Sequence, residues 1–432
     1  MILSGALASM AFAAEPPSRF GVDAPQLARL GEFAVGVRTL HLVARDAVDV
    51  LGYDATRGTA PRRDRALTVD LWYPARPTPG APAVYTASFP SEPPAPPVTF
   101  SVPGIAVRGA PAARPASFPL IVVSHGYSND PAAMTWLTEN LASKGYVVAA
   151  IRHDDPPITD RSKFAGPLLR RPLDIAYVTD TLRKTLAQEH LVDAARVALI
   201  GYSMGGYGAL TAAGATLDPA GPPTQLVPGG LLQPYVRGAL QQDGVAVKGL
   251  RAVVAISPAG GGTLAAWGPQ GLLGIDIPLL LIAGDRDRTV DYASGARAIF
   301  DGAHRAHRYL LTFKNAGHSI GLSPAPDAMR SRLWDQDWFE DPVWRKERIN
   351  AITAHFITAF LDAYVKGDAD RAAYLNVPVS DSSGGGWPAA VAQGAYDSYS
   401  PATDGVTVWK GFQRSQAAGL ELLQAEPSQE EP

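Results

Sequence analysis

The stretch that decides the fold is residues 197–208, VALIGYSMGGYG, near the middle of a chain of 432 residues. Four apolar residues run into Gly201, Tyr202, Ser203, Met204 and Gly205, and a segment of small residues follows. This order predicts a buried strand that turns sharply into a helix, with Ser203 at the corner. Glycines two residues before and two after the serine permit the crowded backbone of such a turn. The stretch therefore predicts a nucleophile elbow, although a glycine-rich strand-to-helix turn without chemistry also fits the bare motif.

The composition is that of a globular protein and excludes several functions. Hydrophobic residues make up 46% of the chain and charged residues 18%, which is enough apolar material for a large core. A net charge of −3 gives no electrostatic support for nucleic acid or for an anionic membrane as a partner. The chain has no cysteine, so disulfides, thiolate metal ligands and a cysteine nucleophile are excluded. We expect no cofactor and no metal.

The first residues, MILSGALASMAFAAEPP, are apolar and small, with an Ala-x-Ala pattern at residues 11–13. This pattern predicts a signal peptide over residues 1–14 and a secreted or periplasmic protein. The apolar run is too short to span a bilayer. No lysine or arginine precedes it, so the basic segment of an ordinary signal is missing. An apolar N-terminus without a targeting role is the alternative.

Short apolar runs alternate with amphipathic segments from residue 119 onward. This alternation predicts an α/β fold, with a mostly parallel, doubly wound sheet and helices on both faces. Period-two alternation at 38–44 and 66–73 adds antiparallel strands at the N-terminal side. The predicted parallel strands are 119–126, 146–153, 197–201, 250–257, 278–284 and 308–313, and the predicted helices are 132–144, 173–188, 204–213, 292–303 and 343–366.

Several segments interrupt this alternation. Residues 74–118 are rich in proline and predict an irregular surface connection. Three longer insertions, at about 214–248, 258–276 and 319–346, could form a cap over the serine. The third places Trp334, Trp338 and Trp344 close together, as substrate-lining residues or as the core of the cap itself. We therefore predict a hydrolase domain over residues 15–376 and a partly disordered C-terminal extension over 377–432.

Two aspartates follow the predicted strand 278–284 and compete for the role of the acid in a serine triad. Counting glycine, two residues, aspartate, two residues, valine from Gly284 selects Asp287, which leaves Asp285 as a structural carboxylate. The same acidic stretch lacks the glycine and the closing glutamate of a calcium loop. Asp287 is therefore the predicted acid.

The predicted base is His318, which lies in a short loop after the strand 308–313. The chain order serine, aspartate, histidine is the one expected for this fold. His153 also follows a strand, but it precedes the serine and is interpreted as a supporting residue. The predicted oxyanion-hole donors are the backbone N–H groups of Met204 and Tyr127.

Taken together, these motifs resemble α/β-hydrolases of the dienelactone hydrolase-like group, which includes platelet-activating factor acetylhydrolase-type esterases. The resemblance implies an α/β-hydrolase domain, a triad of Ser203, Asp287 and His318, and carboxylic-ester hydrolysis without a cofactor. Dienelactone hydrolases themselves use a cysteine nucleophile, so this chain departs from them and a serine esterase is indicated. The matching pieces are DRALTVDLWYPA, FPLIVVSHGYS, GYVVAAIRHDD, RPLDIAYVTDTL, VALIGYSMGGYGAL, PLLLIAGDRDRTVDY, FKNAGHS and ITAFLDAYVKGD, which run from about residue 64 to residue 368.

The sequence thus predicts a serine carboxylesterase whose substrates are small-molecule or polymeric esters. Hydrophobic or bulky esters are favoured, and polyesters are among the candidates. A serine peptidase with the same elbow is one alternative, and a non-catalytic binding protein on this fold is another. An aspartate stands at the elbow of haloalkane dehalogenases and epoxide hydrolases, so Ser203 argues against both. The sequence does not indicate an oligomeric state.

Overall fold

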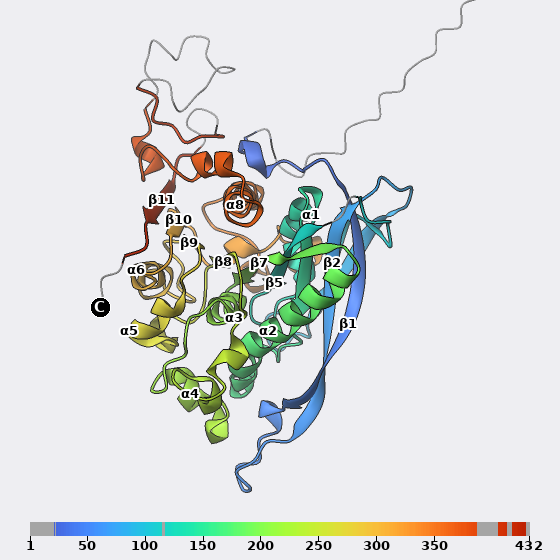
Figure 1. Ribbon diagram of the computed structural model, residues 1–432, viewed down its shortest axis with the longest axis vertical. Helices are drawn as coiled ribbons and strands as arrows, with labels where there is room; N and C mark the ends of the chain where they lie inside the picture. Colours follow the sequence, from blue (N-terminus) through green and yellow to red (C-terminus); the bar gives the residue numbers. More distant parts are fainter. Residues whose placement is uncertain (1–20, 22, 115–116, 387–404, 413–416, 429–432) are drawn as a thin grey trace, which may run out of the picture.

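A sheet of 11 strands runs through the computed structural model, which describes residues 21, 23–114, 117–386, 405–412 and 417–428 (Figure 1). The strand order across the sheet is β11-β10-β9-β8-β7-β5-β6-β2-β1-β4-β3. The strands are β1 Ala34–Val48, β2 Arg62–Ala75, β3 Pro82–Phe89, β4 Val98–Arg108, β5 Phe118–Ser124, β6 Val147–Arg152, β7 Val192–Tyr202, β8 Ala252–Ile256, β9 Leu279–Gly284, β10 Arg308–Phe313 and β11 Leu420–Ala425.

The centre of this sheet is parallel. Strands β6, β5, β7, β8, β9 and β10 pair in parallel with one another in this order, and β7 lies near the middle of them. Strands buried on both faces are expected to be continuously apolar, as β9 is with all six of its residues buried. The mostly parallel α/β fold predicted from the sequence is confirmed.

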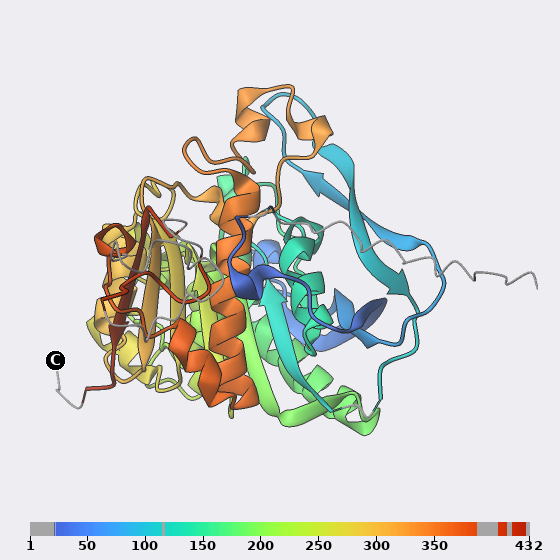
Figure 2. The same cartoon turned by 90° about the horizontal axis from the view of Figure 1, so that it is seen from above.

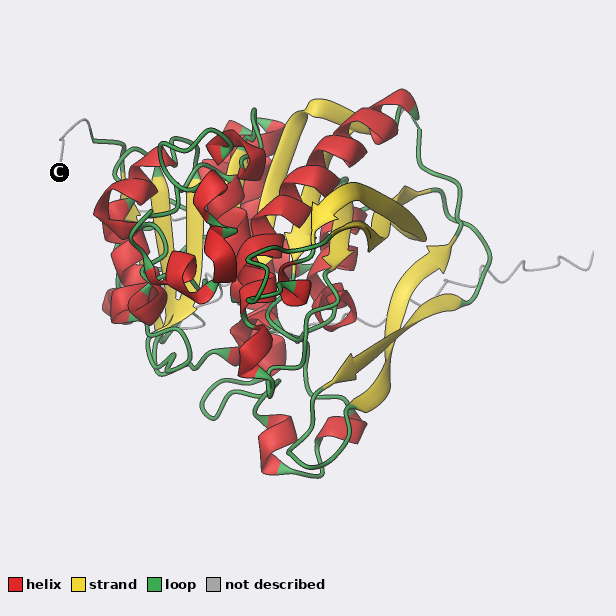
Figure 3. Ribbon diagram, turned by 90° about the horizontal axis from the view of Figure 1, so that it is seen from below, coloured by secondary structure: helices red, strands yellow, loops and turns green. Residues whose placement is uncertain are grey.

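Helices cover both faces of the sheet (Figure 3). Helices α1 and α8 lie on one face, and α2, α3 and α6 lie on the other (Figure 1). Successive residues of a strand point to opposite faces, so within β7 Ile200 packs in the first core and Leu199 in the second. The helices are α1 Thr135–Ser143, α2 Ala165–Gln188, α3 Met204–Ala212, α4 Pro222–Leu226, α5 Gly268–Gly271, α6 Ala298–Gly302, α7 Leu333–Gln336 and α8 Lys346–Leu361.

The N-terminal strands extend the sheet beyond β6. Strand β2 pairs antiparallel with β6, and β1 pairs antiparallel with β2, as predicted. The prediction of an irregular connection over residues 74–118 is wrong, because this segment contains β3 and β4, which form an antiparallel pair. Residues of β3 alternate between exposed and buried, with Tyr85 and Phe89 facing the core. The period-two pattern of β3 was missed because the prolines around this strand indicated an irregular chain.

The insertion 319–346 packs against the β3–β4 turn at one end of the molecule (Figure 2). Phe339 stacks on Phe89 at 5.0 Å between ring centroids, and the carboxylate of Asp335 accepts a hydrogen bond from the Ser91 hydroxyl at 2.8 Å. The insertions 214–248 and 258–276 contribute apolar residues to the second core, where Trp267 stacks on Tyr207 of α3. Coverage of the serine by these segments stays a prediction.

The C-terminal extension supplies a strand to the sheet. Strand β11 pairs antiparallel with β10 and forms the edge of the sheet. Residues 387–404, 413–416 and 429–432 of this extension lie outside the described residues, as does the predicted signal peptide at 1–14. Among the described helices, none combines the length and the apolar character needed to cross a membrane.

Candidate active site

Ser203 lies at the corner between β7 and α3. Its backbone has φ 52° and ψ −116°, a conformation that non-glycine residues rarely adopt and that costs about 1–3 kcal/mol. Two of its backbone hydrogen bonds tie it to β8 and to the residues just after that strand. The Ser203 N–H donates to the Ile256 carbonyl at 2.9 Å, and the Ala259 N–H donates to the Ser203 carbonyl at 2.9 Å. The turn is therefore fixed by the end of the neighbouring strand β8.

The two glycines of the serine motif are required by close backbone approach. A Cβ at Gly201 would lie 2.2 Å from the Gly205 carbonyl oxygen. A Cβ at Gly205 would lie 1.9 Å from the Ser124 carbonyl oxygen, at the end of β5. Both distances are far below van der Waals contact with backbone atoms. The first turn of α3 therefore packs directly on the chain that leaves β5.

The structure brings Ser203, His318 and Asp287 together. His318 Nε2 lies 3.0 Å from Ser203 Oγ, and His318 Nδ1 lies 2.7 Å from Asp287 Oδ2. Because the carboxylate accepts a hydrogen bond from Nδ1–H, the imidazole carries its proton on Nδ1. Its Nε2 is then the nitrogen that can accept the proton of the serine hydroxyl. Each side chain comes from the carboxyl end of a strand, namely β7, β9 and β10, which is where parallel sheets bind ligands.

The acid of this group is buried, whereas the histidine reaches solvent. The Asp287 side chain is 1% exposed and the His318 side chain 18%. Burial opposes ionisation of Asp287, but the hydrogen bond and charge of His318 and the N–H groups of Val290 and Thr289 outweigh it, so the pKa of Asp287 is lowered. Asp287 is thus held as a carboxylate against the imidazole.

The structure places the two alternative residues elsewhere. Asp285 Oδ1 accepts a hydrogen bond from the Asn315 N–H at 2.6 Å, which ties the turn after β9 to the loop of the histidine. His153 is buried and lies 2.9 Å from Ser124 Oγ, not against Ser203. Burial and, next, the charge of Arg171 lower the pKa of His153 to about 4, so it is neutral at pH 7.

The predicted oxyanion donors flank the serine turn. Met204 is the first residue of α3, where helix N–H groups have no intrahelical acceptor. Tyr127 follows β5 by three residues. Within the described part of the chain, neither of these two amides has a hydrogen-bond acceptor. Their role as oxyanion donors stays a prediction.

The three tryptophans of the insertion 319–346 pack mainly on one another and on the fold. Trp334 contacts Trp338, which in turn contacts Phe89, with ring centroids 5.8 Å apart in each pair. Trp344 packs edge-on against Phe313, and its Nε1 donates to the Lys314 carbonyl at 2.8 Å. A role of these rings in lining the substrate stays a prediction.

Sequence reasoning missed the side chains that hold the loop of His318. Asp341 Oδ2 accepts the Gly317 N–H at 2.7 Å, and the Tyr202 hydroxyl donates to the His318 carbonyl at 3.2 Å. The ammonium group of Lys346 donates to the Ser319 carbonyl, and burial lowers the pKa of Lys346 to about 8. These contacts join segments that are distant in the sequence, so no local sequence pattern predicts them.

A cavity of about 650 Å³ is lined by residues of β4, α1, α8 and the segment 323–328. Trp136 lines it and donates from Nε1 to the Gly321 carbonyl at 3.3 Å. None of the predicted site residues lines this cavity. Among the described residues, no group of three or more histidine, aspartate or glutamate side chains is placed to hold a metal.

The strand order and the serine turn define an α/β-hydrolase. The family model described as PET hydrolase-like matches residues 108–221, a segment that includes Tyr127, Ser203 and Met204 but ends before Asp287 and His318. The chain therefore has the α/β-hydrolase fold, and its residues 108–221 are similar to the PET hydrolase-like family.

Two curated relatives match over a similar length. Cutinase est2 of Thermobifida alba is 37% identical over 90 residues, and cutinase est1 of the same organism is 36% identical over 90 residues. Each match covers 21% of this chain and 28% of the relative, so the chain spans about a quarter of the length of these cutinases. Among solved structures, a ferulic acid esterase from Streptomyces cinnamoneus is 22% identical with a TM-score of 0.49, over 78% of this chain and 91% of its own.

Proposed function

We propose that the protein is a serine carboxylic-ester hydrolase that forms an acyl-enzyme on Ser203. The observation that carries the proposal is the double hydrogen bond of His318, at 3.0 Å to Ser203 Oγ and 2.7 Å to Asp287 Oδ2. A base in contact with the nucleophile and oriented by a buried acid is the arrangement that activates a serine hydroxyl. The strained turn at Ser203 presents its Oγ above the sheet, and the N-terminus of α3 favours the negative charge that develops during the reaction.

In the proposed mechanism, Ser203 Oγ attacks the ester carbonyl carbon as His318 Nε2 takes the hydroxyl proton. The carbonyl oxygen becomes an oxyanion that accepts hydrogen bonds from the N–H groups of Met204 and Tyr127, each contributing roughly 3 kcal/mol. The tetrahedral intermediate collapses as His318 returns its proton to the departing alcohol. Water then attacks the acyl-enzyme, His318 takes a proton from it, and Ser203 is restored when the acid leaves.

The proposed substrates are hydrophobic or bulky esters, with polyesters among them. Two observations support this class. The family model that matches the serine segment is described as PET hydrolase-like, and the two curated relatives are cutinases. We also propose that the protein is exported, because residues 1–14 have the apolar pattern and the Ala-x-Ala site of a signal peptide.

The experiment is a chain-length series of p-nitrophenyl esters, from acetate to long acyl chains, with wild type and Ser203→Ala in parallel. We expect hydrolysis of esters by the wild type, a loss of at least about 10³-fold in kcat for the variant, and no cleavage of a peptide anilide. Cleavage of the anilide in preference to esters would replace the proposal with a serine peptidase. An inactive wild type that binds esters without turning them over would indicate a binding protein.

A further inference from the structure

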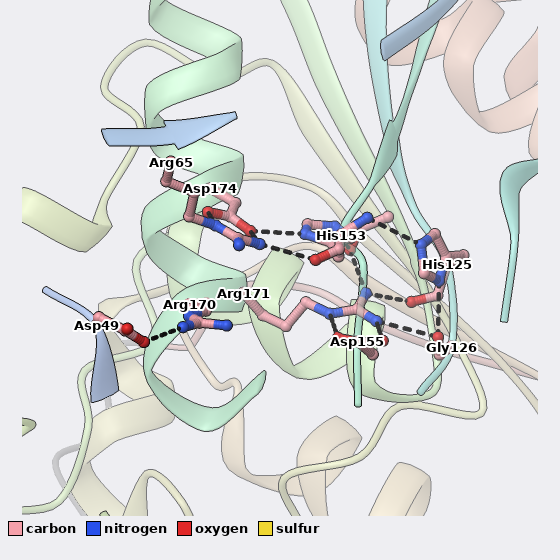
Figure 4. Close-up of polar contacts among 10 residues, drawn as sticks. Asp49, Arg65, His125, Gly126, His153, Asp155, Arg170, Arg171 and Asp174 are labelled. Carbon is pink, nitrogen blue, oxygen red and sulfur yellow. Dashed lines mark hydrogen bonds and ion pairs between the residues drawn. The ribbon is translucent and has the colours of Figure 1, made fainter. Parts of the chain in front are cut away.

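A group of buried polar side chains lies next to His125 and Gly126, the two residues that precede Tyr127 (Figure 4). Arg171 of α2 is completely buried in it, with the carboxylate of Asp155 as its ion-pair partner. Burial of a charged pair costs several kcal/mol in desolvation, so such a pair needs further hydrogen bonds to be tolerated. The proposed mechanism uses neither residue.

Arg171 gives those further hydrogen bonds to the loop. Its Nη1 donates to the His125 carbonyl and to Ser124 Oγ, and its Nη2 donates to the Gly126 carbonyl at 3.0 Å. The Gly126 carbonyl also accepts the Nδ1–H of His125 at 2.7 Å. The Asn129 N–H donates to the same oxygen at 3.3 Å, so three donors hold the peptide group between Gly126 and Tyr127 by its carbonyl, and Arg171 is the only charged one among them.

The orientation of that carbonyl fixes the orientation of the Tyr127 amide. In a trans peptide the C=O and the N–H point in opposite directions. Because the Gly126 carbonyl points to the guanidinium, the Tyr127 N–H points away from it, and it has no acceptor among the described residues. A charge-assisted hydrogen bond to the carbonyl also polarises the peptide, which makes its N–H a stronger donor.

The ion pair holds the loop on the other side of Tyr127 as well. Asp155 Oδ2 accepts the N–H of Ser128 at 3.2 Å. The Arg171–Asp155 pair therefore contacts the residue before Tyr127 through a carbonyl and the residue after it through an amide. A lysine ammonium at this position would keep the charge but could not reproduce the planar fork that reaches two carbonyls and a carboxylate.

A chain of hydrogen bonds keeps Arg171 in place. Ser124 Oγ donates to His153 Nε2 at 2.9 Å, and His153 Nδ1 donates to Asp174 at 3.0 Å. Arg65 binds Asp174 through Nε and Nη2 at 2.8 and 2.7 Å. Ser124, His153 and Asp174 are thus linked in the same order as a serine triad. All three side chains are buried, so no substrate reaches them. Because the Ser124 hydroxyl donates its hydrogen bond to His153, the Ser124 oxygen can accept a hydrogen bond from Arg171.

We propose, on the basis of the proposed ester hydrolysis, that Arg171 is a positioning residue that acts with Asp155 to aim the Tyr127 N–H at the oxyanion. It does not touch the substrate. Its contribution is confined to the stage at which the carbonyl oxygen becomes negatively charged, since a misdirected N–H weakens binding of the oxyanion more than binding of the ester. Substitution of Arg171 should therefore lower kcat more than it raises KM.

The test compares Arg171→Lys with the matched control Arg170→Lys. Arg170 is the neighbouring residue of α2, but its guanidinium pairs with Asp49 at 2.9 Å, away from the loop. Each protein is assayed with p-nitrophenyl butyrate and with its thionoester, in which sulfur replaces the carbonyl oxygen. Sulfur accepts N–H hydrogen bonds poorly, so the ratio of kcat/KM for ester over thionoester reports the oxyanion donors.

We expect Arg171→Lys to lose about 10²-fold in kcat on the ester with little change in KM, and to lose less on the thionoester, so that the ratio falls. Partial unfolding would reduce both activities equally and leave the ratio unchanged. Arg170→Lys should match the wild type. If Arg171→Lys is not recovered folded, Asp155→Asn loosens the same pair and should lower the ratio as well.

An active wild type together with a folded variant of unchanged ratio would overturn this inference alone. A wild type that hydrolyses no ester would overturn the proposed function, and the inference with it.

Discussion

Replacement of Asp287 by asparagine tests the geometry of the triad in detail. Asp287 Oδ1 accepts the N–H groups of Thr289 and Val290 at 2.9 and 3.1 Å, while Oδ2 faces His318 Nδ1 at 2.7 Å. In Asp287→Asn the amide oxygen stays with the two backbone donors, so the NH₂ group faces the imidazole. His318 must then accept at Nδ1 and carry its proton on Nε2, where it cannot take the proton of Ser203.

The expected loss is large because, among the described residues, Asp287 is the hydrogen-bond partner of His318 Nδ1, and no second acceptor there can restore the tautomer. The Asp287 side chain is 1% exposed, so water does not replace the carboxylate. A histidine held in the wrong tautomer lowers kcat about 10⁴-fold in a serine protease, which corresponds to about 5 kcal/mol in the activation barrier. We expect a loss of this order in initial rates on p-nitrophenyl butyrate at pH 7, with KM changed little.

The matched control is Asp285→Asn, two residues earlier in the same turn. Asp285 Oδ1 accepts the Asn315 N–H, and an amide oxygen can keep this hydrogen bond. The control should therefore stay within about threefold of the wild type in kcat. If Asp287→Asn stays within about tenfold of the wild type, or if Asp285→Asn loses as much activity as Asp287→Asn, the assignment of the acid is wrong.

Two further predictions concern stability. In Gly205→Ala the new Cβ would overlap the Ser124 carbonyl oxygen, so the free energy of unfolding in urea should fall by about 3 kcal/mol or more, and an unchanged urea midpoint would contradict the packing described. Burial and then the charge of Arg171 lower the pKa of His153 to about 4 in the folded protein. The pKa of a histidine in the unfolded chain is about 6.5. Between pH 4 and pH 6.5 the unfolded state therefore binds more protons than the folded state. Stability should therefore fall by about 3 kcal/mol from pH 6.5 to pH 4 through this residue, and His153→Gln should flatten the decline measured by urea unfolding. An equally steep decline in the variant would show that His153 titrates normally.

The sequence was sufficient for the features that depend on local patterns. The glycines around Ser203 predicted a strand-to-helix turn, and the apolar runs predicted the parallel centre of the sheet, because fully buried strands are apolar throughout. The spacing from Gly284 selected the aspartate that lies against His318 in the structure. These predictions needed only neighbouring residues and the order of elements along the chain.

Features built from distant segments could not be predicted in this way. The contact of Arg171 with Gly126 joins residues 45 positions apart, and Arg171 follows another arginine, Arg170, that the sequence does not distinguish from it. Strand β3 was missed although Ala83, Tyr85, Ala87 and Phe89 alternate with exposed residues, because the neighbouring prolines indicated an irregular chain. Pairing partners are set by tertiary packing, which overrides local preference.

The most direct test of the central claim is to identify the atom that becomes acylated. The wild type and Ser203→Ala are treated with a fluorophosphonate, and intact mass and peptide mass spectrometry locate the adduct. We predict one adduct per wild-type chain, on the peptide that contains Ser203, together with loss of esterase activity in proportion to labelling, and no adduct on the variant. An active wild type that is labelled elsewhere, or a Ser203→Ala protein that keeps the ester turnover of the wild type, would contradict the account.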